Sequence, residues 1–248
     1  MQRKRIWLKD KLILGLALID FAMREFRDPG GFVSFSYENM YGFTPQGYKK
    51  QNFNMLVSRL SKNKKMSKIV KDGKVCFIIS DCKGILIEKF PLLGLREKWD
   101  GMFQVAIFDI EEVNRVRRNF LRRKLKELGF GMWQRSVWVS PLSIKNKFRE
   151  FLKEQEFSEM VYIFSVKKED FGDLKSFANG VWKLEEINKQ YKGWMERLEA
   201  TKGKSLQDNL KNEFLDIVLR DPFLPKEFLP QDWLGEQALK LFRQETMI

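Results

Sequence analysis

The chain lacks the residue most often used for acid–base and transition-metal chemistry, because it contains no histidine. Histidine is the commonest general base and the commonest transition-metal ligand. The two cysteines, Cys76 and Cys82, cannot complete a tetrahedral zinc site unless carboxylates join them. We therefore interpret them as reduced, buried thiols of a cytoplasmic protein, and we expect no cofactor.

A second group of polar residues has the types and spacing needed to bind nucleic acid. A helix from Pro45 to about Asn63 would carry one apolar stripe, formed by Phe53, Leu56, Val57 and Leu60. Amides and hydroxyls on the other side can bond to base edges, and the cations there can bind phosphates. We expect base reading from Tyr48, Gln51, Asn54 and Ser58, and phosphate contacts from Lys49, Lys50, Arg59, Lys62, Lys68, Lys71 and Lys74.

The elements around that helix predict a winged helix-turn-helix over residues 1–90. Asp10 can cap a first helix, whose apolar run Leu12–Ile19 is too short to cross a membrane. Thr44 as N-cap and Pro45 as the first helical residue would begin the recognition helix. Two strands, 66–70 and 74–79, predict a basic hairpin that would serve as the wing, followed by a short helix at 85–90.

The distribution of charge agrees with a nucleic-acid surface near the N-terminus. The net charge is +13, which points to a polyanionic partner. Residues 1–90 carry +10 of it, residues 91–180 carry +4, and residues 181–248 carry −1. We therefore expect double-stranded DNA as the partner of the first third of the chain.

Residues 99–184 predict a second, ferredoxin-like domain of β-α-β…β-α-β order. Its expected strands are 103–108, 133–141, 159–166 and 181–184. A strongly basic helix ended by Gly129 follows the first strand, and further helices are expected at 145–154 and 171–178.

Three strings in this region and two in the tail resemble the PaaX-like regulators, the phenylacetate-degradation repressor family. They are Trp99-Asp100-Gly101, FQVAIFDIEE (103–112), LGFGMWQRSVWVSP (128–141), VWKLEEINKQY (181–191) and RDPFLPKEFLPQDWLGEQALKLF (220–242). The resemblance implies a homodimeric repressor that binds a palindromic operator and is released by an acyl-CoA thioester. The segment 212–220 lacks the histidine and paired arginines of that family, so the effector is expected to differ or to be absent.

The middle domain also resembles the small CRISPR-associated spacer-acquisition nuclease, the second Cas protein. Asp109 ends a strand as in that family, and Gln134-Arg135-Ser136-Val137 matches its Gln-x-Ser-Val strand. Asp109 therefore has three interpretations: a cap of the following helix, a residue at a dimer seam without catalysis, or a catalytic ligand of Mg²⁺. Mg²⁺ is expected only under the third.

The tail predicts helices at 183–200 and 205–219, an extended proline-containing arm, and a last helix from Trp233. The sequence thus favours an α+β chain with a winged-helix domain (1–90), a ferredoxin-like dimerisation domain (99–184) and a C-terminal helical domain (185–248). The favoured function is a dimeric, sequence-specific transcriptional regulator without membrane association. The alternatives are a metal-dependent nuclease or CRISPR spacer-acquisition subunit that uses Asp109, and a structural protein that binds DNA of any sequence.

Overall fold

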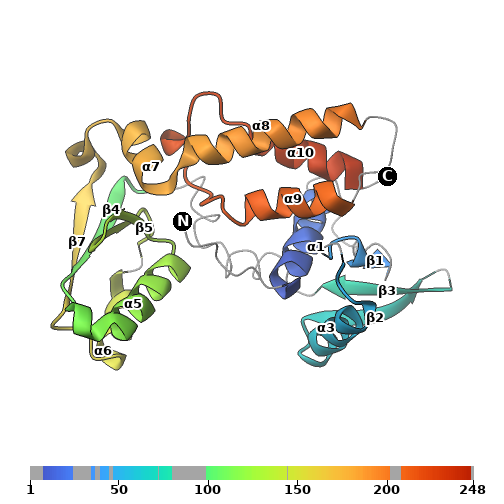
Figure 1. Cartoon of the computed structure of the whole chain (residues 1–248), viewed down its shortest axis with the longest axis horizontal. Coiled ribbons are helices and arrows are strands. Elements are labelled where there is room, and N and C mark those ends of the chain that lie inside the picture. The colour runs from blue at the N-terminus through green and yellow to red at the C-terminus, as the bar shows by residue number, and fades with distance from the viewer. Residues whose placement is uncertain are drawn as a thin grey trace. The chain divides into compact units, whose positions relative to one another are not determined.

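The computed structural model describes residues 8–24, 35–36, 40–44, 47–71, 73–79, 99–143, 145–201 and 208–246. The chain is a mixture of α-helices and antiparallel sheets (Figure 1). Its contacts divide it into two compact units: unit 1 contains residues 1–86, 187–221 and 234–248, and unit 2 contains residues 87–186 and 222–233. The predicted helix at 85–90 and Cys82 lie outside the described residues. Within the described residues, no helix is long and apolar enough to cross a membrane.

In the part of the chain that the structure describes, the N-terminal region of unit 1 includes two long helices and a three-stranded sheet. Helix α1 (Leu8–Arg24) is followed by β1 (Phe35–Ser36), α3 (Lys50–Lys62), β2 (Met66–Lys71) and β3 (Lys74–Ile79). The strand order is β1-β3-β2, and both pairs are antiparallel. Gly73, at the hairpin turn, has a φ of +73°, a conformation that glycine adopts without steric cost. The predicted hairpin is confirmed.

The predicted start of the recognition helix is wrong. Helix α3 begins at Lys50, and its N-cap is Lys49. The Thr44 hydroxyl donates to the Tyr41 carbonyl three residues earlier (2.8 Å). Gly47 then adopts a φ of +80°. A glycine in the left-handed region interrupts the helical path, so the chain turns once more before α3 starts.

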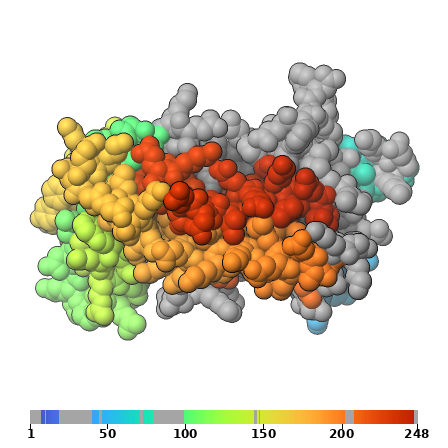
Figure 2. All heavy atoms as spheres, turned by 90° about the horizontal axis from the view of Figure 1, so that it is seen from above, coloured from blue at the N-terminus to red at the C-terminus, as the bar shows by residue number. Residues whose placement is uncertain are grey.

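Three C-terminal helices complete unit 1, and they lie where the sequence predicts helices. They are α8 (Leu184–Ala200), which begins in unit 2, α9 (Asp208–Val218) and α10 (Gly235–Thr246). Figures 1 and 2 show α8 and α10 side by side. An aromatic cluster joins the three, because Phe214 lies 4.7 Å from Trp194 and 4.2 Å from Phe242 between ring centroids. Helix α1 contacts both α9 and α10.

Unit 2 is built on a four-stranded antiparallel sheet of order β5-β6-β4-β7. Its elements are β4 (Met102–Phe108), the 3-10 helix η2 (Glu112–Asn114), α5 (Arg115–Glu127), β5 (Gly131–Gln134), β6 (Val137–Ser140), α6 (Lys145–Glu154) and β7 (Val161–Lys167). With one helix between β4 and β5 and another between β6 and β7, this is a ferredoxin-like βαββαβ order. Helices α5 and α6 bury Leu121, Leu125 and Phe148 against Phe108 and Trp138 of the sheet.

Two of the predicted strands of this domain are wrong. Residues 133–141 form a hairpin rather than one strand, because the chain turns at Arg135-Ser136 between β5 and β6. Residues 181–184 are helical: α7 (Leu174–Trp182) ends at Lys183, which is left-handed, and α8 starts at Leu184. The side chains of Val181 and Trp182 instead pack on Gly131, where a Cβ atom would lie 2.3 Å from Val181 Cγ1.

A second core lies at Phe103, the start of β4. Phe103 is fully buried among Ala178, Leu184, Leu224 and Phe228. The last two come from the proline-containing arm, in which the 3-10 helix η4 spans Lys226–Phe228; a further 3-10 helix, η3, spans Lys168–Phe171. The conspicuous 222–230 string is therefore a packing segment of unit 2.

Candidate nucleic-acid interface

Helix α3 has one buried face and one exposed face. Phe53, Val57 and Leu60 are buried, and the Phe53 ring meets Tyr41 edge-on with 5.0 Å between centroids. This packing anchors the helix and determines which side chains point outward. The exposed face is therefore presented by a fixed scaffold.

The segment that leads into α3 is held by hydrogen bonds from two directions. The Tyr41 hydroxyl donates to the Tyr48 carbonyl (2.8 Å), which closes the loop before the helix. The Asn212 side-chain amide, on α9, donates to the Thr44 carbonyl (2.8 Å) and to the Asp208 carbonyl (2.8 Å). A second link between the ends of the chain is the ion pair of Lys11 with Asp216 (2.8 Å). The start of α3 is thus tied to the C-terminal helices of unit 1.

Most of the predicted DNA-binding residues are exposed on this unit. The exposed ones are Lys49, Lys50, Gln51, Asn54, Ser58, Arg59, Lys62 and Lys68. Tyr48 is half-buried, and its carbonyl accepts the hydrogen bond from Tyr41. Lys71 and Lys74 face each other as partners at the tip of the β2–β3 hairpin; their side chains lie outside the described part of the structure.

Sequence reasoning missed three apolar residues on the same surface. Met55, on α3, is 58% exposed, and Val70 and Val75 are exposed on the hairpin. Met55 is adjacent to Asn54 and one turn before Ser58, so the same helical wheel would have placed it outside. It was missed because methionine is normally a core residue. In a DNA interface, an exposed apolar side chain can contact the methyl group of thymine.

The backbone of α3 adds favourable electrostatics at its first turn. The turn contains Lys50 and no acidic residue, and the N-cap Lys49 is extended. The N-terminus of a helix presents unpaired N–H groups and a partial positive charge, which favours a phosphate. The cationic side chains and the backbone N–H groups at this end of α3 therefore both favour the binding of a phosphate.

Helix α5, the second basic helix, uses its central arginines within unit 2. Arg117 donates to the carbonyls of Gln155 (3.3 Å) and Glu156 (3.0 Å), and its guanidinium lies over the Phe157 ring. Arg122 donates to the carbonyl of Arg135 (2.8 Å) and so holds the β5–β6 turn. These groups satisfy the carbonyls that end α6 and the turn.

The charges on α5 also perturb one another. A hydrogen bond from Arg118 (2.5 Å) lowers the pKa of Glu112 below its usual value. Burial lowers the pKa of Arg122, and the positive charges of Arg118 and Arg135 lower it further. Arginine nevertheless stays charged at any physiological pH. The cluster is therefore cationic, with one carboxylate, Glu112, paired to it.

Asp109 is exposed at the end of β4, and its backbone N–H donates to the Met160 carbonyl (3.2 Å). The N-cap of η2 is Glu111 and that of α5 is Asn114, so the interpretation of Asp109 as a helix cap is wrong. Among the described residues, no group of three or more histidine, cysteine, aspartate or glutamate side chains could hold a metal ion. The roles of Asp109 at a dimer seam or in binding Mg²⁺ stay predictions.

The remaining cysteine of the described residues is buried, and the polar residues around Asp221 form hydrogen bonds within the chain. Cys76 is a free, buried thiol on β3. The carboxylate of Asp221 is buried and accepts a hydrogen bond from the Tyr191 hydroxyl (2.9 Å). Arg220, next to it, donates to the Gln190 side chain (2.9 Å). An effector for the C-terminal region stays a prediction.

Comparisons with known proteins identify the middle and C-terminal regions. The family model described as "PaaX protein central Cas2-like domain" matches residues 96–178, and that described as "PaaX-like protein C-terminal domain" matches residues 182–247. A search of curated proteins found no match. Among solved structures, the uncharacterized protein Rv0674 from Mycobacterium tuberculosis is 16% identical, with a TM-score of 0.52; the likeness covers 95% of this chain and 97% of that one, and it concerns the fold alone. The two family models together span more than half of the residues, and the chain belongs to the PaaX-like family, with a Cas2-like middle domain.

Proposed function

We propose that this protein is a dimeric, sequence-specific DNA-binding transcriptional regulator, in which the N-terminal part of unit 1 is a winged helix-turn-helix. Membership of the PaaX-like family supports a regulatory role. The order helix, strand, recognition helix and hairpin, with the sheet order β1-β3-β2, supports the winged-helix assignment. In this arrangement α3 enters the major groove and the β2–β3 hairpin is the wing.

The observation that carries the proposal is the composition of the exposed face of α3. Gln51 and Asn54 can each form a bidentate pair with adenine, and the Ser58 hydroxyl can donate a hydrogen bond to a base edge or accept one from it. Arg59 and Lys62 lie in the last turn, where they can reach phosphates. A surface that only attracted nucleic acid non-specifically would need the cations but not the amides.

A homodimer completes the proposal because two copies of α3 can then read two half-sites of a palindromic operator. A small-molecule effector that releases the DNA is the corresponding proposal for regulation; it need not be an acyl-CoA, because residues 212–220 lack the histidine and paired arginines of the family. Both rest on the family resemblance, and the dimer is tested by analytical ultracentrifugation of the free protein and of its DNA complex.

The function is tested by selecting DNA fragments with the purified full-length protein and measuring their affinity by fluorescence anisotropy. We expect one sequence class to be enriched, and its affinity to fall by about 0.9 log unit per log unit of salt for each neutralised phosphate. Gln51→Ala is expected to weaken binding, whereas Gln237→Ala, an exposed amide on α10, leaves it unchanged. Equal affinity for all sequences, or affinity that does not respond to salt, contradicts the proposal.

A second candidate function is metal-dependent cleavage of nucleic acid at Asp109. The exposed position of this carboxylate at the end of β4, inside the region matched by the Cas2-like family model, favours it. Two such aspartates, one from each subunit, would share one Mg²⁺. DNA and RNA are incubated with Mg²⁺ and the protein, its Asp109→Ala variant, or Asp170→Ala as an exposed carboxylate control. Cleavage that persists in Asp109→Ala excludes this site.

A further inference from the structure

Strand β7 lies at one edge of the sheet of unit 2, and its outer backbone groups are positioned to pair with another strand. The Asp109 N–H donates to the Met160 carbonyl, and the Lys168 N–H donates to the Gly101 carbonyl. In an antiparallel ladder, every second residue forms a backbone hydrogen-bonded pair with the neighbouring strand. Tyr162, Phe164 and Val166 therefore direct their N–H and C=O groups toward β4. The N–H and C=O groups of the residues between them, Ile163, Ser165 and Lys167, point away from the sheet. In the described residues, no strand pairs with this side of β7.

This edge has few of the features with which proteins usually protect an exposed strand. Its seven residues include no proline or glycine, and the one charged residue, Lys167, is the last. Tyr162 and Phe164 are 60% and 49% exposed, and Ile107 on β4, directly opposite Tyr162, is 38% exposed. A long apolar edge of this kind readily accepts an additional strand.

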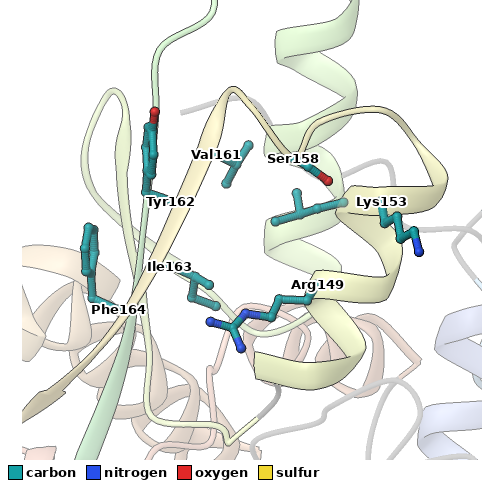
Figure 3. A pocket seen from close by; sticks show the side chains of 8 residues that line it. Arg149, Lys153, Ser158, Val161, Tyr162, Ile163 and Phe164 are labelled. Atoms are coloured by element: carbon teal, nitrogen blue, oxygen red, sulfur yellow. The ribbon is translucent and has the colours of Figure 1, made fainter.

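Beside the edge, α6 and β7 enclose a cavity of about 440 Å³ (Figure 3). Arg149 and Lys153 of α6 line it together with Ile163, and among the residues that the structure describes no acidic one does so. Figure 3 shows the Arg149 side chain extending toward β7 on the side of Ile163, with Tyr162 and Phe164 on the opposite side of the strand. A strand added at this edge would therefore meet cations on one face and apolar side chains on the other.

We propose that β7 binds an extended, acidic segment of a partner protein, which adds to the sheet as a fifth strand. Its backbone pairs with Ile163, Ser165 and Lys167, its carboxylates meet Arg149 and Lys153, and its alternate apolar side chains cover Tyr162 and Phe164. The charges disfavour a second copy of this chain, because antiparallel pairing of β7 with itself brings two Arg149–Lys153 clusters to one face of the seam. The site lies within unit 2 and is independent of the proposed DNA surface.

The probe is a fluorescein-labelled seven-residue peptide in which valine alternates with glutamate, added to the full-length protein and followed by anisotropy. We expect saturable binding that falls at least 10-fold in Arg149→Glu/Lys153→Glu. The matched control, Lys189→Glu/Lys192→Glu, changes two exposed lysines of α8 and is expected to bind as the parent does. Equal binding of a peptide with lysine in place of glutamate overturns the proposal.

The backbone part of the proposal has its own test. N-methylation of alternate peptide bonds keeps the charge but removes the N–H donors, and it is expected to abolish binding. In the protein, Lys167 has a φ of −75°, which proline can adopt, so Lys167→Pro removes one outward N–H without disturbing β4. It is expected to bind more weakly than Lys167→Ala. The peptide should also slow hydrogen exchange at Ile163, Ser165 and Lys167. Unchanged exchange together with full binding of the N-methylated peptide overturns strand addition, whatever the outcome for DNA.

Discussion

Helices α3 and α5 are both thirteen residues long and both basic, but they use their cations differently. Helix α5 carries seven arginines and lysines and α3 carries three. On α5, Arg117 and Arg122 bind backbone carbonyls, and Arg118 binds Glu112. On α3, the cations share an exposed face with amides and a hydroxyl. The number of cations on a helix therefore does not by itself identify a nucleic-acid surface.

The physical reason lies in the side chains themselves. A guanidinium has five donors in a planar fork and stacks on aromatic rings, so it can close the end of a neighbouring helix while covering a phenylalanine. Arg117 does this at the end of α6, over Phe157. Lys126 likewise lies over Trp138. The basic helix of unit 2 is thus largely a packing element, and its basicity alone does not predict a second DNA surface.

The largest expected effect on DNA binding comes from the amides of α3. Gln51→Ala/Asn54→Ala is expected to weaken binding to the selected sequence by about 1–3 kcal/mol for each lost bidentate pair. Both positions are exposed, so the free energy of unfolding should change by no more than about 0.5 kcal/mol. Anisotropy and urea denaturation measure the two effects. Unchanged affinity would contradict the assignment of DNA binding to α3 rather than to α5.

On α5, substitution of the arginines is expected to reduce stability rather than DNA binding. Arg117→Met/Arg122→Met removes three hydrogen bonds to carbonyls, and we expect a loss of about 1–3 kcal/mol in the free energy of unfolding. DNA affinity should stay within about twofold, because these groups act inside unit 2. The exposed Arg115→Met is the control and should be near neutral. A variant of normal stability that no longer binds DNA would reassign α5 to the interface.

A smaller effect is expected from a single phosphate contact. Lys62→Ala should weaken binding to all DNA sequences about equally and reduce the slope of log affinity against log salt by about 1. The measurement is a salt titration beside Lys126→Ala of α5, which should keep the parent slope. Equal slopes for parent and Lys62→Ala would show that this lysine makes no phosphate contact.

The smallest effect concerns the ion pair between Arg118 of α5 and Glu112, which precedes the helix. Because the hydrogen bond from Arg118 lowers the pKa of Glu112, Arg118→Ala should raise that pKa toward the ordinary value for glutamate. A depressed folded-state pKa means that the pair stabilises the fold above about pH 4.3 and that this contribution is lost as the pH falls. An NMR titration of the Glu112 side chain measures the pKa. An unchanged value in Arg118→Ala would contradict the pairing.

Much of the secondary structure was predictable because its signals are local. The hairpin 66–79, helix 145–154 and the last helix follow from spacing and turn residues, and the structure places them within a few residues of the prediction. The outward face of α3 was predictable for the same reason, since Phe53, Val57 and Leu60 alone orient the helix.

Two of the wrong predictions fall where distant residues decide. The turn at Arg135-Ser136 contains no glycine, proline or asparagine, and it is held instead by Arg122 and by the Phe108 N–H, which donates to the Ser136 carbonyl (3.0 Å). Residues 181–184 have strand-like composition but are helical, where Val181 and Trp182 pack on Gly131. The hydrogen bonds of Arg117 and Arg122 depend on carbonyls that follow α6 and β5. The sequence pattern of α5 alone does not reveal these partners.

The hydrogen bond from Asn212 to the Thr44 carbonyl joins residues 168 positions apart in the chain. Together with the Lys11–Asp216 ion pair, it makes the folding of the α3 region depend on residues of α9, which are synthesised long after α3. Such long-range contacts form slowly because a large loop must close first. During translation, the exposed face of α3 therefore acquires its final support only after α9 has left the ribosome. Under the proposed function, newly made protein therefore gains its affinity for DNA only after α9 has been synthesised and has packed.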